Sequence, residues 1–125
     1  MTQPYGATVL EHFRRPRNQR ALEHPSASRE GYNPLCGDRV RIELDVKDSV
    51  IRSAAFTANA CAICTASASL LTEHVSGMTL DAALRVSDAE TVAALATEIP
   101  PGRMLCAILP VRTLREAIAE LRSSA

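Results

Sequence analysis

The sequence has no tryptophan, and its large aromatic side chains are limited to two phenylalanines and two tyrosines. Proteins that hold single-stranded nucleic acid stack its bases on several exposed aromatic rings, which this chain can barely supply. The 14 basic and 14 acidic side chains cancel, so an electrostatic binder of nucleic acid or of acidic membranes is disfavoured. We therefore expect neither nucleic acid nor a membrane as a partner.

Long hydrophobic runs are also missing. No apolar stretch approaches the roughly 20 residues that a membrane-spanning helix needs. The first five residues lack the basic and then apolar layout of a signal peptide, which favours a cytoplasmic protein. Hydrophobic residues make up 46% of the chain and charged residues 22%, so long disorder is not expected. The length of 125 residues fits one domain over residues 1–125.

The strand signals lie in the first half of the chain. Strict alternation of apolar and polar residues over residues 39–47 predicts a strand with one buried face. Asp48 and Ser49 suit a turn into a returning strand over residues 50–57, whose weaker alternation leaves its register open. The preceding stretch, residues 18–33, is interpreted as an extended surface segment.

Helical spacing of apolar residues dominates elsewhere. The expected helices cover residues 5–14, the stretch from Cys61 toward Gly77, residues 80–85, the stretch from Ser87 to Leu95, and a last helix carrying Val111, Leu114, Ile118 and Leu121. Ser87 and Glu90 fit a capping box. Pro110 suits the last helix if it lies in the first turn. The order of elements predicts an α+β fold, a small antiparallel β-sheet packed with helices.

Four cysteines could carry chemistry: Cys36, Cys61, Cys64 and Cys106. In a cytosolic chain, metal binding or thiol chemistry is favoured over disulfides. Cys36 and Asp38 share a turn and could share a metal, although from these residues alone a turn in which Asp38 bonds only nearby backbone N–H groups is favoured. Cys61 begins a helix, where a thiolate is stabilised, but a small buried hydrophobe is an equal alternative. Cys106 lies near another helix start, or packs in the core.

The spacing of these cysteines is a weak signal. Cys61 and Cys64 form a Cys-x-x-Cys pair, but no βαβ pattern surrounds it, so a thioredoxin-type redox pair is disfavoured and Cys64 is interpreted as a packed or spare thiol. Cys36, Cys61 and Cys106 lie 25 and 45 residues apart, and only folding can gather them. Each lies at the end of an element, and such ends can converge at one edge of a sheet.

The other candidate residues are less informative. His12, His24 and His74 are each expected to be solvated rather than to bind a metal. The cluster of basic residues comprises Arg14, Arg15, Arg17 and Arg20. This cluster is interpreted either as a solvated helix end or as a docking patch for an acidic protein partner.

Several motifs stand in the order of one known family. They are His12-Phe13 with Pro16-Arg17-Asn18, Asn33-Pro34-Leu35-Cys36-Gly37-Asp38, Phe56 through Cys61-Ala62-Ile63 into Ala66-Ser67-Ala68-Ser69, and Arg103 through Cys106 to Ala117-Ile118. Over residues 5–120 the chain resembles the U-type iron–sulfur cluster assembly scaffold family, which comprises IscU, SufU and the N-terminal domain of NifU. The motif around Cys36 followed by the one that begins at Cys61 is the specific part.

The resemblance implies a fold, a ligand set and partners. The implied fold is a small antiparallel sheet packed with helices, and the implied ligands are Cys36, Asp38, Cys61 and Cys106. In the family they hold a transient cluster, usually [2Fe–2S], or a zinc ion when no cluster is present. A pyridoxal-phosphate cysteine desulfurase supplies sulfur as a persulfide, for which Cys36 and Cys106 are the candidate acceptors. The cluster then passes to apo-proteins, so the resemblance implies a scaffold rather than a turnover enzyme.

The chain also departs from the family pattern. Leu105 stands where IscU has histidine, and Ala60 where glycine is common. Ile99-Pro100-Pro101-Gly102-Arg103 replaces the Leu-Pro-Pro-Val-Lys segment that a dedicated Hsp70 chaperone recognises, and the insertion of SufU is absent between Gly77 and Arg103. A zinc-bound sulfurtransferase partner that accepts persulfide and activates a desulfurase is therefore the main alternative. A thiol oxidoreductase and a metal-free interaction domain are the others.

Overall fold

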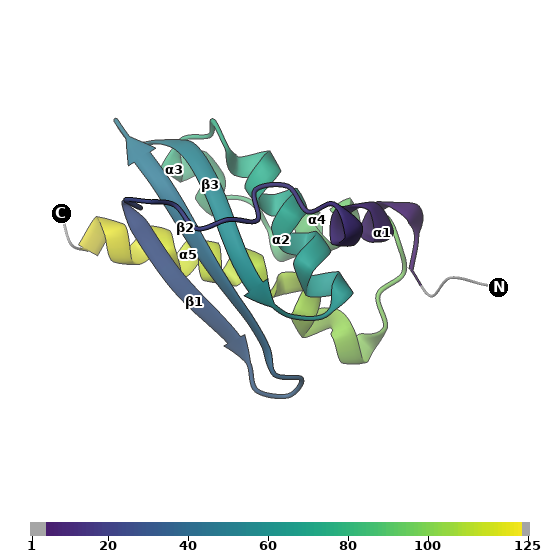
Figure 1. The fold of residues 1–125 in the computed structure, drawn as a ribbon. Helices are drawn as coiled ribbons and strands as arrows, with labels where there is room; N and C mark the ends of the chain where they lie inside the picture. Colours follow the sequence, from purple (N-terminus) through teal and green to yellow (C-terminus); the bar gives the residue numbers. More distant parts are fainter. Residues whose placement is uncertain (1–4, 124–125) are drawn as a thin grey trace.

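The computed structural model describes residues 5–123. Residues 1–4 and 124–125 lie outside the described residues. The prediction that the N-terminal segment lacks the layout of a signal peptide falls largely on residues 1–4. The described chain forms an antiparallel sheet in the order β1-β2-β3, with β1 at Ala27–Asn33, β2 at Asp38–Lys47 and β3 at Val50–Asn59. Helices cover one face of this sheet, α5 over β1 and β2 and α2 over β3 (Figure 1). The predicted α+β class is confirmed.

The turn and the register of the β2–β3 hairpin explain why the alternation weakens along β3. Asp48 and Ser49 both have positive φ, 54° and 61°, as a tight two-residue hairpin turn requires. The register then shifts, because Asp45 pairs with Ser53 whereas the next residue of β2 pairs with Ile51. The bulged residue between them returns Ile51 to the buried face.

Strand β1 was not predicted, because residues 18–33 were interpreted as a surface segment. The strand lacks an apolar stripe, and next to its centre it carries Gly31 rather than a large residue. A Cβ atom at Gly31 would lie 2.0 Å from Oγ1 of Thr113 on α5. Glycine therefore lets β1 approach the helix closely, and this packing replaces the hydrophobic pattern that would have revealed the strand.

The segment before β1 crosses the face of the sheet that the helices leave open (Figure 1). Asn18 takes a positive φ of 62°, and its carbonyl oxygen accepts the N–H of Phe56 at 2.9 Å. Further along, the buried carboxylate of Glu43 accepts the backbone N–H of Leu22 at 2.9 Å and the hydroxyl of Ser28 at 3.2 Å. These bonds tie a segment without regular structure to the sheet.

The helical part follows the sequence pattern closely. The described helices are α1 at Ala7–Arg14, α2 at Ala62–Val75, α3 at Leu80–Leu84, α4 at Asp88–Ala94, a 3-10 turn at Pro101–Arg103 and α5 at Met104–Ser123. The capping box of Ser87 and Glu90 is confirmed. Pro110 is the exception to the prediction, since it is the seventh residue of α5, not part of its first turn. The 3-10 turn runs directly into α5 and starts that helix earlier than expected.

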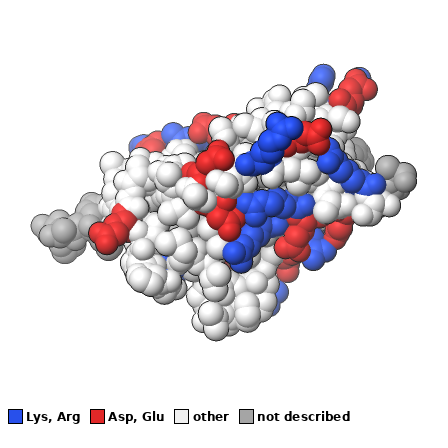
Figure 2. Space-filling model, turned by 180° about the vertical axis from the view of Figure 1, so that it is seen from behind, with Lys and Arg blue, Asp and Glu red and all other residues white. Residues whose placement is uncertain are grey.

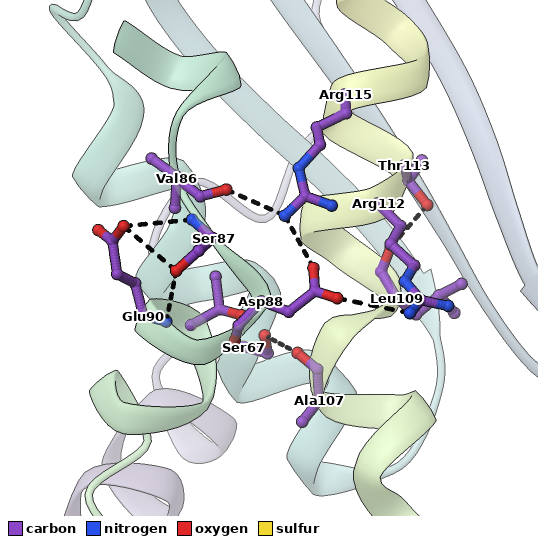
Figure 3. A network of polar contacts seen from close by, with 11 residues as sticks. Ser67, Val86, Ser87, Asp88, Glu90, Ala107, Leu109, Arg112, Thr113 and Arg115 are labelled. Carbon is purple, nitrogen blue, oxygen red and sulfur yellow. Dashed lines mark hydrogen bonds and ion pairs between the residues drawn. The ribbon is translucent and has the colours of Figure 1, made fainter.

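Two polar links join α5 to its neighbouring helices (Figure 3). Arg115 donates to Asp88 at 2.7 Å and to the carbonyl of Val86 at 3.0 Å, which fixes α4 on α5. The buried hydroxyl of Ser67 on α2 donates to the carbonyl of Ala107 at 2.6 Å. Because Ala107 follows Cys106, this bond holds the start of α5 beside α2. No helix within residues 5–123 is both long and apolar enough to span a bilayer.

Candidate metal centre

The loop between β1 and β2 is shaped by its own residues. Asn33 ends β1 opposite Asp38, which begins β2. The N–H of Gly37 donates to the carbonyl of Asn33 at 2.8 Å, and Gly37 has a φ of +79° that favours glycine. The resulting turn leaves Cys36 exposed and buries Asp38 to 5% exposure.

Cys36 and Cys106 meet although they lie 70 residues apart. Their Sγ atoms are 3.4 Å apart, Cys36 on the loop and Cys106 in the first turn of α5. Together with a carboxylate oxygen of Asp38, their ligand atoms all lie within 4.8 Å of one another. The structure therefore gathers three of the four residues implied as ligands.

Asp38 has one bonded and one unbonded oxygen. Its Oδ1 accepts the backbone N–H of Cys61 at 3.1 Å. Its Oδ2 is buried and has no hydrogen-bond partner within residues 5–123. A buried acceptor without a partner is costly, and a cation at that oxygen would relieve the cost. Two thiols beside such an oxygen fit a thiophilic metal ion or an iron–sulfur cluster.

The pKa of the Asp38 carboxyl reflects the thiols around it. Burial on its own would raise this pKa, but the nearby thiols of Cys106 and Cys61 and the hydrogen bond from the backbone N–H of Cys61 outweigh burial, and the pKa lies below its usual value. The thiol of Cys36 has a smaller effect in the same direction. Asp38 is therefore ionised next to three thiols, and it is the common neighbour of all of them.

Cys61 lies at the edge of the group. It is the N-cap of α2, as the sequence predicted, and its side chain is half-buried. Its backbone N–H bonds Asp38, but its thiol is not among the three ligand atoms that the structure places together. Cys64, one turn further along α2, is completely buried, as expected of a packed thiol, and burial raises its pKa.

Cys106 holds its proton tightly when no metal is bound. Burial is the main reason that the pKa of the Cys106 thiol is raised, and the nearby Asp38 and Cys36 side chains add to the effect. A metal bound there would displace that proton, because a thiolate is the ligand form.

Sequence reasoning missed two neighbours of Cys106. The side-chain amide of Asn33 donates to the Cys106 sulfur at 3.9 Å. The thiol of Cys106 also raises the pKa of the Arg103 guanidinium. The available signals were an asparagine before proline, which often bonds its own turn, and an arginine one helical turn before the cysteine.

Exposed apolar side chains flank the two cysteines. Leu35 is 83% exposed, Leu105 41% and Met104 36%. Figure 2 shows charged side chains of both signs over the centre and right of the helical face, whereas its lower left part is largely uncharged.

The histidines and the arginine cluster lie outside the metal group. His12 is buried and bonded to the Ser69 hydroxyl at 2.7 Å, so the prediction of a solvated side chain is wrong. The packing of α1 on α2 encloses its ring. His24 and His74 are exposed, as predicted. In the arginine cluster, Arg15 and Arg17 each pair with Glu11 at 3.0 Å, while Arg14 and Arg20 are exposed.

The fold and the site define a small α+β protein with a candidate metal centre, lined by cysteine and aspartate, where the strands of its sheet end. The chain belongs to the NifU-like N-terminal domain family, whose model matches residues 4–125. The iron–sulfur cluster assembly scaffold protein IscU 1 of Archaeoglobus fulgidus is 34% identical over 116 residues, which are 93% of this chain and 75% of that protein.

A further relative and a solved structure are also similar to this chain. The iron–sulfur cluster assembly scaffold protein IscU of Escherichia coli K12 is 32% identical over 124 residues, covering 95% of this chain and 94% of the relative. A crystal structure of a nitrogen-fixing NifU-like protein (N-terminal) from Brucella abortus matches with a TM-score of 0.79 at 22% identity, covering 96% of this chain and 95% of that one. The latter likeness confirms the fold.

Proposed function

We propose that this protein is an iron–sulfur cluster assembly scaffold whose cargo is bound by Cys36, Asp38, Cys61 and Cys106. The observation that carries the proposal is the convergence of Cys36, Asp38 and Cys106 around a buried carboxylate oxygen with no partner among the described residues. Membership of a family with named scaffold relatives supports it. The cargo would be a labile [2Fe–2S] cluster.

The four proposed ligands would have different roles because their side chains differ in exposure. Cys36 is exposed and can meet an incoming group, whereas Cys106 is buried and can anchor the cargo from within. Cys61 bonds Asp38 and would complete the set by turning its half-buried side chain toward the other thiols. Three thiolates are suitable ligands for such a cluster.

Sulfur would come from a pyridoxal-phosphate cysteine desulfurase as a persulfide. Cys36 and Cys106 are the candidate acceptors, and the exposure of Cys36 favours it as the first to react. The apolar rim of Leu35, Met104 and Leu105 would contact the desulfurase and, later, the apo-proteins that receive the cluster. The segment around Pro100 and Pro101 gives no support for a handoff to an Hsp70 chaperone.

Asp38 would make the bound cluster easier to release to an acceptor protein. A carboxylate is a harder ligand than a thiolate and holds a sulfide-rich cluster less tightly. One such ligand among thiolates leaves a bond that an acceptor can displace first.

A second candidate function is that of a zinc-bound sulfurtransferase partner, which accepts persulfide from a desulfurase and activates it. The donor set favours it too, since thiolates and a carboxylate suit tetrahedral zinc. One thiolate would leave the zinc to accept sulfur. Desulfurase turnover that rises only with the zinc-loaded protein, with no cluster formed, would support this alternative.

The test is anaerobic reconstitution of the reduced chain with iron and sulfide, followed by quantification of iron, sulfide and zinc in the same sample. Equal amounts of iron and sulfide that move to an apo-ferredoxin support the scaffold. Zinc near one ion per chain without labile sulfide contradicts it. Cys36→Ser should lose most of the cluster, whereas Cys64→Ala, which changes a packed thiol outside the group, should retain it.

A further inference from the structure

Asn33 bonds two parts of the metal centre without belonging to its ligand group. Its side chain is buried to 6% exposure, and both of its polar atoms are used. Oδ1 accepts the backbone N–H of Leu35 at 3.1 Å, inside the loop that carries Cys36. Nδ2 donates to Sγ of Cys106 at 3.9 Å, on α5. One side chain therefore connects the loop to the sulfur of a distant helix.

Few side chains could make both bonds. The amide of asparagine is short, neutral and able to accept and to donate at once. Aspartate could accept the N–H of Leu35 but has no donor for the sulfur. Serine could bond the loop in a similar turn, but its side chain is too short to extend to Cys106. Asn33 thus supplies two separable functions.

The bond to sulfur makes the two facing thiols inequivalent. Cys106 receives an amide N–H, whereas no amide within residues 5–123 donates to Cys36. An N–H donor withdraws electron density from a thiolate, which makes it a weaker donor to a metal. Hydrogen bonds to ligand sulfurs set the reduction potentials of iron–sulfur clusters and change metal affinity.

We propose that Asn33 is a positioning residue of the metal centre, whose amide N–H holds and tunes the sulfur of Cys106 while its oxygen shapes the loop of Cys36. The inference rests on the proposed function in taking Cys106 as a ligand. It follows that a bound cluster has a higher reduction potential than it would have without this amide.

Two variants separate the two bonds. Asn33→Ser and Asn33→Asp both keep an oxygen for the N–H of Leu35 and both remove the donor to sulfur, but only the second adds a charge. Asn59→Asp is the control for charge, because Asn59 is exposed at the end of β3 and close in sequence to Cys61. The probes are Co²⁺ alone, read by its sulfur-to-cobalt charge-transfer band, and the midpoint potential of the reconstituted cluster.

We expect both Asn33 variants to bind cobalt with the band shifted to longer wavelength and to hold a cluster of more negative potential. Asn59→Asp should leave the band in place. The tuning role is wrong if Asn33→Ser has the wild-type band and potential. It is also wrong if Asn33→Asp and Asn59→Asp shift the band equally while Asn33→Ser does not shift it. Loss of cobalt binding in both Asn33 variants, with unchanged circular dichroism, would also overturn it and leave Asn33 as a loop-forming residue only.

The cobalt measurement also separates this inference from the proposed function. A wild-type chain that binds cobalt, shows the shifts on substitution and yet assembles no transferable cluster would support Asn33 and contradict the scaffold. A wild-type chain that binds no cobalt would overturn both.

Discussion

The sulfur atoms of Cys36 and Cys106 face each other at 3.4 Å, one on an exposed loop and the other completely buried at the start of α5. The pair is therefore open to solvent from one side only. In the proposed function, this asymmetry would make the entry of cargo depend on Cys36 and its retention on Cys106.

Alkylation should distinguish the four thiols. In reduced, metal-free protein, iodoacetamide should modify Cys36 first, because Cys36 is the exposed one, and Cys64 and Cys106 last, because both are buried. Zinc should slow the modification of Cys36. Peptide mass spectrometry over time gives the order of labelling. Faster labelling of Cys106 than of Cys36, or no protection by zinc, would contradict the arrangement of the site.

Replacing the carboxylate should slow the release of the cluster. Asp38→Ala removes the hard ligand, so we expect transfer to an apo-ferredoxin and decay in the presence of a chelator to slow by about tenfold, a barrier increase of ~1.4 kcal/mol. Visible absorption after anaerobic reconstitution measures both rates.

The control for this substitution is Asp45→Ala, an exposed aspartate of the same strand. It should release its cluster at the wild-type rate. Unchanged or faster decay in Asp38→Ala would show that the carboxylate does not make the cluster labile.

The elements predicted correctly are those whose signal is local. The alternation that defines β2 and the capping box of Ser87 and Glu90 each lie within a few residues, and the structure has both. Strand β1 was missed because it is held by the close approach of Gly31 to Thr113, which lies 82 residues further along (113 − 31). Pro110 was misplaced because the helix start depends on the preceding 3-10 turn.

The residues of the site could be predicted from the sequence, but their arrangement in space could not. Turn chemistry and the family motif singled out Cys36, Asp38 and Cys106, yet only the packing of α5 on the sheet brings their ligand atoms together. The burial of His12 and the dual bonding of Asn33 also depend on tertiary contacts. No period or motif in the sequence encodes such contacts.

A methyl group at the β1–α5 contact should destabilise the fold. Gly31→Ala places a Cβ atom 2.0 Å from the Thr113 hydroxyl, so we expect a loss of about 1–3 kcal/mol in the free energy of unfolding. Adding Thr113→Ala should restore part of that loss, because it removes the atom that clashes. Urea denaturation measures each variant. Gly102→Ala is the control, since no atom lies within 4 Å of its added Cβ and the change should be small.

Acid should loosen the packing of α1 on α2 through His12. Burial lowers the pKa of the His12 ring below its usual value of 6.5, and Arg17 adds to the effect, while Glu73 and Glu11 oppose it. The unfolded chain then binds the proton more readily than the folded one. The neutral ring thus contributes its full stability above about pH 6.5, and this contribution falls as the pH decreases toward the lower folded-state pKa.

Unfolding free energies measured in urea between pH 5 and 7.5 test this pH dependence. His12→Asn keeps a polar atom near the Ser69 hydroxyl but does not titrate, so it should flatten the dependence over this range. His74→Asn, at an exposed position on α2, should leave the slope unchanged. An equal slope in the wild type and in His12→Asn would assign the acid sensitivity to other groups. A stability that rises on acidification would mean that the folded state favours the charged ring. The conclusion that His12 is enclosed as a neutral ring would then be wrong.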